Sequence, residues 1–406
     1  MLNYTTIAGV RCLFIDLPDA NSVTTLMLVK AGSLYEGTTH HGISHFLEHM
    51  FFKGGKKWPT PKAVAQAIED FGGETNAFTS NEYAGYYIKA APPYLRQSME
   101  ILADMLLEAT FMNEEIEREK GVVLQEIAMY NDEPQEVLAD ARQLRYLGNN
   151  VFGRNIIGTN ETVMAIRRED LFSHRDALYT KDNSLLVIAG RLPSHAECEA
   201  MVSDFFGPMK QYCSASLPSY VHQRPLTSSY HVDHPAQQNH MIMSFDGMPY
   251  HHPMRMTANI VMTAFGGCMS SRLFQHIREQ RGLCYYIGGG HSTYRDYGYF
   301  RVSAGLDKVR FEEGSQAIRD EIECLFLGGL TDEEFMRAKR YTRGQLQMGL
   351  EGTDSFANYY GKKMLLYDDT CSLDEVIDQY EAVTMDEVQS FLSTWKPQAV
   401  YQAVIG

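Results

Sequence analysis

Apolar positions recur along the chain with two different periods, and these periods predict alternating strands and helices. Short segments rich in Val, Leu, Thr and Phe, bounded by Gly, Pro or Asp, are typical of strands. Longer segments with apolar residues three or four positions apart are typical of amphipathic helices. The predicted strands lie at 9–18, 23–33 and 183–190, with a strand, turn and strand at 75–91; the predicted helices lie at 42–55, 61–73, 93–109, 113–130 and 195–207.

A segment without periodicity interrupts this series. Residues 207–228 are rich in Pro and Ser, which is typical of a connection between compact units. We therefore predict a first lobe at 1–206, an interlobe linker at 207–228 and a second lobe at 229–406. The length of 406 residues agrees with two lobes, because one ordinary core does not extend over a chain of this size.

The second lobe repeats part of the first. The segment NEYAGYYIKAA at 81–91 parallels RDYGYFRVSAG at 295–305, and two predicted helices follow each of them. The last of these helices align without a gap, 111–127 against 330–346. An internal duplication explains both observations, so we predict an α+β fold of two homologous lobes that each layer strands and helices.

The aligned helices differ in their acids. Glu119 is opposite Ala338 and Glu126 is opposite Gln345. The helical pattern is therefore present in both lobes, whereas these two carboxylates occur in the first lobe alone. This asymmetry indicates that the acids of the first lobe have a function.

Composition and charge narrow the classes of partner. The net charge of −15 argues against a nucleic-acid partner, because phosphate binding needs clustered Lys and Arg. The seven cysteines are scattered without a CxxC pair, as in reduced intracellular proteins. The N-terminus does not resemble a signal peptide, and no apolar run approaches the roughly 20 residues that span a bilayer. We expect a cytoplasmic protein without a membrane or nucleic-acid partner.

The helix predicted at 42–55 carries the main candidate chemistry. His45, Glu48 and His49 are related by three and four positions, so their side chains share one helix face. Two imidazoles one turn apart can bind a single Zn²⁺, and a carboxylate beside them can act on a water without being a ligand. The alternative is an ordinary helix whose polar residues are satisfied by hydrogen bonds.

A catalytic zinc site also needs a third protein ligand and an open position. The candidates are Glu119 and Glu126, which are seven residues apart and so line one face of the helix at 113–130. An acidic helix is usually a solvated surface, which is the alternative. However, GVVLQEIAMY around Glu126 is largely apolar, and a carboxylate that packs inward needs a partner such as a metal.

These residues resemble a known family. His45, Glu48 and His49, followed by Glu119 and Glu126, look like the inverted zinc motif of the pitrilysin and insulinase peptidases. The segments AGSLYEG, GGETNAFTSNEYAGYY and SSRLFQHIREQRGLCY also resemble family segments, in family order. The resemblance covers most of the chain. The length of the chain points to the two-lobe branch of the family, which resembles the mitochondrial processing peptidase β-subunit and its bacterial relatives.

The resemblance implies a metalloendopeptidase with one Zn²⁺ per chain. His45, His49 and Glu126 would bind the metal, and Glu48 would be the general base. Glu119 would orient a ligating histidine. The strand residues Asn76, Ala77, Phe78 and Thr79 would pair with an extended peptide substrate.

The second lobe would complete the site. Arg278 and Tyr285 match the pair that the family uses to hold substrate carbonyls and stabilise the oxyanion. The implied fold has a mostly antiparallel sheet packed with helices in each lobe, and the two lobes form half of a clamshell chamber. A dimer would close that chamber, so Arg278 and Tyr285 would act on the zinc of the partner chain.

Several alternatives stay open at this point. The dimer is expected to be a homodimer, with a heterodimer of sister chains as the alternative. A catalytically silent structural or partner subunit is the second functional class, because some relatives have lost part of the metal motif. A peptidase dedicated to one peptide is the third. The ligand set favours zinc over Mn²⁺ or Co²⁺.

Overall fold

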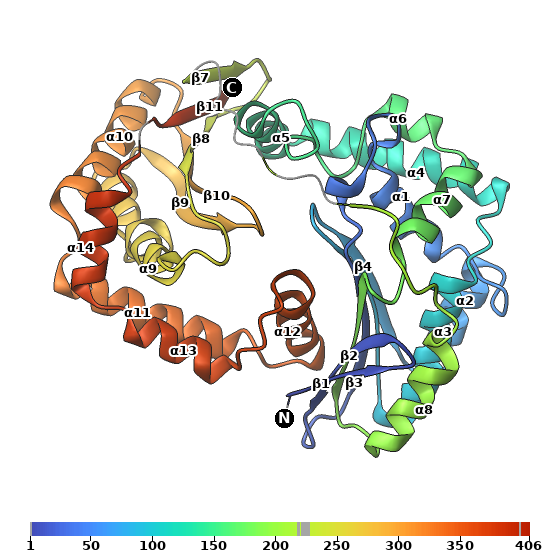
Figure 1. Cartoon of the computed structure of the whole chain (residues 1–406). Helices are drawn as coiled ribbons and strands as arrows, with labels where there is room; N and C mark the ends of the chain where they lie inside the picture. Colours follow the sequence, from blue (N-terminus) through green and yellow to red (C-terminus); the bar gives the residue numbers. More distant parts are fainter. Residues whose placement is uncertain (1, 217–219, 221–227, 398) are drawn as a thin grey trace. The chain divides into compact units, whose positions relative to one another are not determined.

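The computed structural model describes residues 2–216, 220, 228–397 and 399–406 (Figure 1). The chain divides into two compact units. Unit 1 comprises 1–129, 154–218 and 350–370, and unit 2 comprises 130–153, 219–349 and 371–406. Each unit contains one sheet and its helices, which confirms the α+β fold with two lobes. Among the helices of the described residues, none combines the length and apolar character needed to cross a bilayer.

The sheet of unit 1 has six strands in the order β1-β2-β6-β3-β5-β4. All neighbours pair antiparallel except β2 and β6, which are parallel. The central strands β3 and β6 are buried throughout, as expected for strands covered on both faces. The strands are β1 (Leu2–Ile7), β2 (Val10–Asp16), β3 (Val23–Val29), β4 (Glu74–Thr79), β5 (Ala84–Ala90) and β6 (Ser184–Gly190).

Helices of unit 1 pack on this sheet through apolar faces. The helix α2 shows how local sequence sets an end: the Thr60 hydroxyl accepts the Ala63 amide, and Pro61 is the first helical residue. The helices are α1 (Ile43–Phe51), α2 (Pro61–Glu69), α3 (Leu95–Leu107), α4 (Asn113–Asp132), α6 (Asn160–Ala165), α7 (Arg168–Leu178), α8 (His195–Phe206) and α12 (Thr353–Tyr367); the last residues of α4 extend into unit 2.

The sheet of unit 2 has five strands in the order β7-β11-β8-β10-β9, and only β7 and β11 are parallel. The strands are β7 (Ser229–Val232), β8 (Asn239–Asp246), β9 (Cys284–Thr293), β10 (Gly298–Leu306) and β11 (Tyr401–Ile405). The helices are α5 (Pro134–Leu147), α9 (Arg255–Gly266), α10 (Phe311–Gly328), α11 (Asp332–Met348), α13 (Leu373–Ala382) and α14 (Met385–Thr394), with a π-helical segment at Phe274–Gln280.

The two sheets share one topology. Without β1, the strands of unit 1 follow the order β2-β6-β3-β5-β4, and replacing each strand by its counterpart in chain order gives β7-β11-β8-β10-β9. The single parallel pair also falls at the same place in both sheets. The helices α11 and α12 each begin 219 residues after their counterparts α4 and α5 (113 to 332 and 134 to 353). An internal duplication explains these correspondences.

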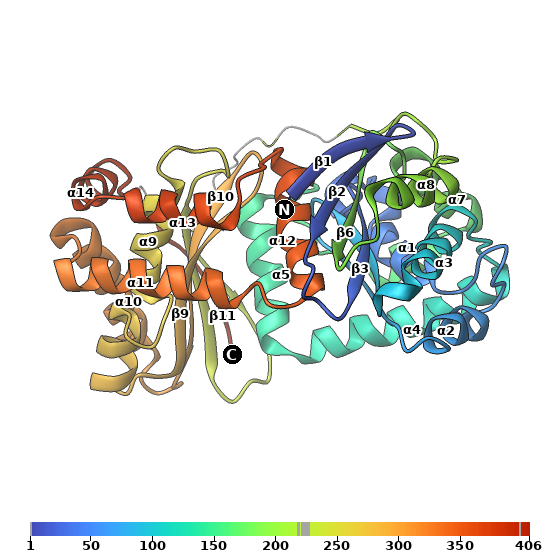
Figure 2. The ribbon, with the colours of Figure 1, turned by 90° about the horizontal axis from the view of Figure 1, so that it is seen from below.

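Each half of the chain contributes one helix that packs on the sheet formed by the other half. The helix α5 contacts β8 and β11 in unit 2, and its counterpart α12 contacts β3 and β6 in unit 1. Figure 2 shows the red-orange α12 beside the blue strands of the first sheet. Gly361 permits this contact, because a Cβ there would lie 2.6 Å from Leu28 and 2.9 Å from Val187.

The compact units therefore differ from two continuous segments. The division predicted at 1–206 and 229–406 places α5 in the first lobe and α12 in the second lobe. Their packing instead places α5 in unit 2 and α12 in unit 1. Residues 217–219 and 221–227 of the predicted linker at 207–228 lie outside the described residues, and its described part is irregular.

Candidate metal centre

The helix α1 is held at its first turn by a buried carboxylate. Glu36 accepts hydrogen bonds from the amides of Gly42 and Ser44, both at 2.8 Å. Gly42 has φ 92°, a left-handed conformation, and a Cβ there would lie 2.5 Å from the Ile157 carbonyl oxygen. Glu36 therefore satisfies amides that the start of a helix leaves without partners, although burial raises the pKa of its carboxyl group to about 7.

The two faces of α1 have different environments. Phe46, Leu47, Met50 and Phe51 are fully buried in the core of unit 1. This apolar face fixes the rotation of the helix, because turning it would expose all four side chains. His45 and His49 consequently lie side by side, with ring centroids 4.7 Å apart and partial exposure.

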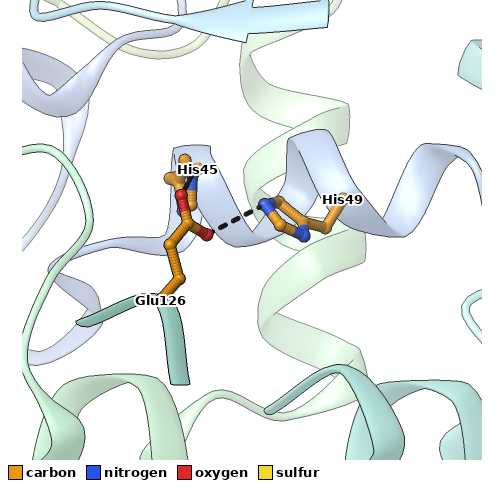
Figure 3. A group of neighbouring side chains, drawn as sticks. All are labelled: His45, His49 and Glu126. Carbon is orange, nitrogen blue, oxygen red and sulfur yellow. Dashed lines mark ion pairs between the residues drawn. The ribbon is translucent and has the colours of Figure 1, made fainter. Parts of the chain in front are cut away.

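Glu126 on α4 faces this histidine pair (Figure 3). Its Oε1 lies 3.7 Å from His45 Nε2, and its Oε2 lies 3.6 Å from His49 Nε2. One ligand atom from each of the three residues lies within 4.8 Å of the others. Among the residues that the structure describes, no other set of three His, Cys, Asp or Glu side chains meets this condition.

Glu119 contacts the outer edge of His49. The His49 Nδ1 atom lies 2.8 Å from Glu119 Oε1, and Lys53 Nζ lies 2.6 Å from Glu119 Oε2. Burial alone would raise the pKa of Glu119, but the hydrogen bonds and charges of His49 and Lys53 lower it overall. The ionised carboxylate thus accepts the Nδ1 proton and leaves the Nε2 lone pair directed toward Glu126.

The two histidines differ in their protonation, and that of His45 favours metal binding. Burial, aided by the charge of His49, lowers the pKa of His45 to about 4, so His45 is neutral at physiological pH. Burial would lower the pKa of His49 as well, but the hydrogen bond to Glu119 and nearby carboxylates raise it overall. Two imidazole nitrogens and a carboxylate oxygen match the donors of a catalytic zinc site with an open position.

Glu48 lies beside this group and contacts β4. Its Oε2 accepts a hydrogen bond from the Thr79 hydroxyl at 2.5 Å. Burial raises the pKa of Glu48, with the Glu126 charge acting in the same direction, while the Thr79 hydrogen bond and His49 oppose the rise. A carboxyl group whose pKa is raised toward neutrality can accept and return a proton near neutral pH.

The other predicted residues lie on β4 and in unit 2. Asn76 to Thr79 form the end of β4, and β4 is the edge strand of its sheet. Arg278 lies in the π-helical segment, stacks on Phe274 at 4.5 Å and pairs with Glu279 at 3.7 Å. Tyr285 lies near the start of β9 with 74% of its surface exposed, so its side chain is not part of the core.

Three contacts were not expected from the sequence. Glu36 supports the first turn of α1, Lys53 neutralises Glu119, and Thr79 binds Glu48. Only Lys53 had a visible signal, because it follows His49 by four positions and so shares its helix face. Glu36 lies only six and eight positions before the amides that it binds, but no pattern marks it, and Thr79 lies 31 positions from Glu48.

Both halves of the chain match domains of a known peptidase family. Residues 11–160 match the family described as Insulinase (Peptidase family M16), and residues 165–341 match the Peptidase M16 inactive domain. An uncharacterised zinc protease of Bacillus subtilis is 32% identical over 95% of this chain and 93% of its own length. The chain belongs to peptidase family M16. An uncharacterised zinc protease of Mycobacterium leprae is also 32% identical, over 98% of this chain and 90% of its own length.

Solved structures share the fold of this M16 protein. An M16 inactive domain from Pseudomonas fluorescens has a TM-score of 0.92 at 17% identity and covers 100% of this chain and 98% of its own. A protease from Helicobacter pylori has a TM-score of 0.91 at 18% identity, covering 100% of this chain and 99% of its own. The family assignment agrees with the resemblance noted in the sequence.

Proposed function

We propose that this M16 protein is a zinc-dependent endopeptidase that hydrolyses unfolded peptides or short polypeptides. The observation that carries the proposal is the convergence of His45, His49 and Glu126, with Glu48 beside them on α1. Relatives described as zinc proteases match nearly the whole chain, which supports the same assignment.

The residues of the chain divide the chemistry among them. A zinc ion held by His45, His49 and Glu126 would supply Lewis acidity at the open position. Glu48 would take a proton from the attacking water and pass it to the leaving amine. Glu119 would keep His49 in the tautomer that presents Nε2, since its carboxylate accepts the Nδ1 proton.

Substrate binding would use the free edge of β4. An extended peptide that pairs with this strand gains main-chain hydrogen bonds without a specific side chain. The Thr79 hydroxyl would then connect the end of the substrate strand to Glu48. Arg278 and Tyr285 of a second chain would hold the substrate carbonyls in a chamber formed by a homodimer, with a heterodimer as the alternative.

Among its described residues, the second half of the chain offers no competing metal centre. It matches a family domain described as inactive, and α9 contains no His, Asp or Glu. The first half retains all three candidate metal ligands and the candidate base, which favours an active enzyme over a silent partner subunit.

Incubation with unstructured peptides, followed by mass spectrometry, tests the proposal. The wild type should cleave internal bonds, and Glu48→Gln should keep the bound metal and the fold but lose cleavage. The matched control is Glu114→Gln, which makes the same change on an exposed position of α4. Cleavage that persists in Glu48→Gln would contradict the role of Glu48, and a wild type that cuts nothing would contradict activity of this chain alone. A strict monomer in light scattering would contradict the shared chamber.

A further inference from the structure

A buried arginine in unit 2 lacks the partner that buried cations normally have. Four basic residues are buried in the described part of the chain, three lysines and Arg142. Each lysine forms an ion pair: Lys120 with Glu117 at 2.9 Å, Lys339 with Glu381 at 3.8 Å and Lys363 with Asp369 at 3.3 Å. No carboxylate of the described residues pairs with Arg142. Because burying an unpaired charge is costly, this exception needs a cause.

The contacts of Arg142 leave donors available. Its Nε donates to the Ser244 hydroxyl at 2.9 Å, and its guanidinium stacks 3.7 Å from the Tyr299 ring and 4.8 Å from the Tyr146 ring. The Nη2 atom is buried and has no hydrogen-bond partner. Aromatic faces attract a cation but accept no conventional hydrogen bond. The Asp246 carboxylate instead accepts the Tyr146 hydroxyl at 2.8 Å.

A cavity adjoins this guanidinium between α5 and the sheet. Its empty volume, including the open mouth, is about 300 Å³, and its lining includes Arg142, Arg145, Tyr230 and Tyr401. Arg145 follows Arg142 by three positions, so both lie on the same side of α5. The Arg145 guanidinium stacks 4.3 Å from the Tyr230 ring and makes no ion pair among the described residues. Two cations without a carboxylate therefore line one small cavity.

The counterpart helix shows that the fold does not require this cavity. Arg142 lies 219 residues before Gly361 of α12, the offset that relates the two helices. Gly361 allows α12 to contact Leu28 and Val187 of its sheet directly. At the equivalent position, α5 carries an arginine and a cavity in place of close packing. Tyr299 is a polar neighbour of Arg142: burial would raise the pKa of Tyr299, but the charge of Arg142 and hydrogen bonds, one of them with Arg142, lower it overall.

We propose that this cavity binds a single oxyanion group, either a free anion such as phosphate or the carboxylate of a peptide. Arg142, which lines the cavity, supplies a buried guanidinium, and Arg145 supplies a second, exposed cation. The planar guanidinium suits oxygen anions because its donors form a fixed fork. The site lies wholly within unit 2 and does not rest on the proposed peptidase activity.

Calorimetric titration with inorganic phosphate at fixed ionic strength tests the site. We expect saturable binding that Arg145→Met weakens about tenfold, as for the loss of one charge-assisted interaction, and that Arg142→Met abolishes. Arg340→Met, which removes an exposed cation from α11, should bind phosphate as the wild type does. Competition with N-acetylglycine and with its amide then separates a peptide carboxylate from a free anion. If N-acetylglycine displaces phosphate and its amide does not, the site binds carboxylates. If neither displaces phosphate, the site binds the free anion.

Two results would overturn the proposal. One is the absence of saturable binding for both phosphate and N-acetylglycine. The other is equal binding by the wild type and Arg145→Met, since the anion would then occupy another place, such as the metal centre. Because Arg145 is exposed, its variant should fold even if Arg142→Met does not. Circular dichroism of each variant establishes the fold before titration.

Discussion

Helices α4 and α11 occupy the same place in the two repeated halves but have opposite roles. Both pack an apolar face into a core, through Ile116 and Val123 in α4 and through Phe335 in α11. Glu119 and Glu126 of α4 face α1 and its histidines, whereas the aligned residues of α11 are the buried Ala338 and the exposed Gln345. The comparison teaches that one helical scaffold can carry a metal centre or only a core contact and a solvated surface, according to the residues at two positions.

The largest expected effect comes from giving α4 the residue of α11. Glu126→Gln should lose zinc and reduce peptide cleavage about a thousandfold or more, because several kcal/mol of charge stabilisation leave with the metal. Metal analysis and a peptide assay measure both. The reciprocal Gln345→Glu variant should bind no second ion. The helix α9, which follows β8 as α1 follows its counterpart β3, has no histidine. Retention of one zinc per chain in Glu126→Gln would exclude Glu126 as a ligand.

The reverse exchange at the other position tests the core of unit 2. Ala338→Glu should lower the free energy of unfolding by about 3 kcal/mol or more, because a buried carboxylate would lack a partner there. Urea unfolding measures the change. Ala338→Gln has nearly the same volume without the charge, so it separates steric strain from charge burial. Equal destabilisation by the two variants would show that size alone matters at this position.

A smaller effect is expected where α4 only supports a ligand. Glu119→Ala leaves His49 Nδ1 and Lys53 without their acceptor, so zinc affinity should fall roughly 10- to 100-fold. Competition with a chelator measures the affinity. Glu114→Ala, an exposed acid of the same helix, is the control and should bind zinc as the wild type does. An unchanged affinity in Glu119→Ala would show that His49 is oriented by other contacts.

The smallest effect concerns the edge strand beside the centre. Thr79→Val removes the hydrogen bond that lowers the pKa of Glu48 and leaves burial, which raises it, unopposed by that bond. The base acts when ionised, so the acid limb of the pH–rate profile should move to higher pH. Activity should therefore fall several-fold more at pH 6 than at pH 8. Thr79→Ser should restore the wild-type profile, and an unshifted limb in Thr79→Val would separate Thr79 from the base.

Much of the local structure could be predicted from the sequence, because its causes are local. The periods of apolar residues located β2, β3 and α1, and the start of α11 has a local cause too, the capping box of Thr331 and Glu334. The spacing of His45 and His49 placed them on one face of a helix, where the structure has them. Such features depend on neighbours within a few positions along the chain.

The remaining features depend on which surfaces meet. An amphipathic pattern shows that α12 buries one face, but not that it covers β3 and β6 of the other half. The apolar setting of Glu126 suggested an inward carboxylate, yet spacing alone left Glu119 as a candidate ligand too, and only the family resemblance gave the two acids different expected roles. The contact of Glu48 with Thr79 spans 31 positions and has no sequence signature.

The packing of α12 also bears on synthesis at the ribosome. The first sheet is complete once residue 190 has emerged, but the face that α12 covers stays open until residue 367 follows. At 5–20 residues per second, that interval is roughly 10 to 35 seconds. During this time, Leu28 and Val187 present an apolar surface to the cell. The nascent chain is therefore a natural client for chaperones, and truncation before α12 should yield an aggregating product even when every residue of the metal centre is present.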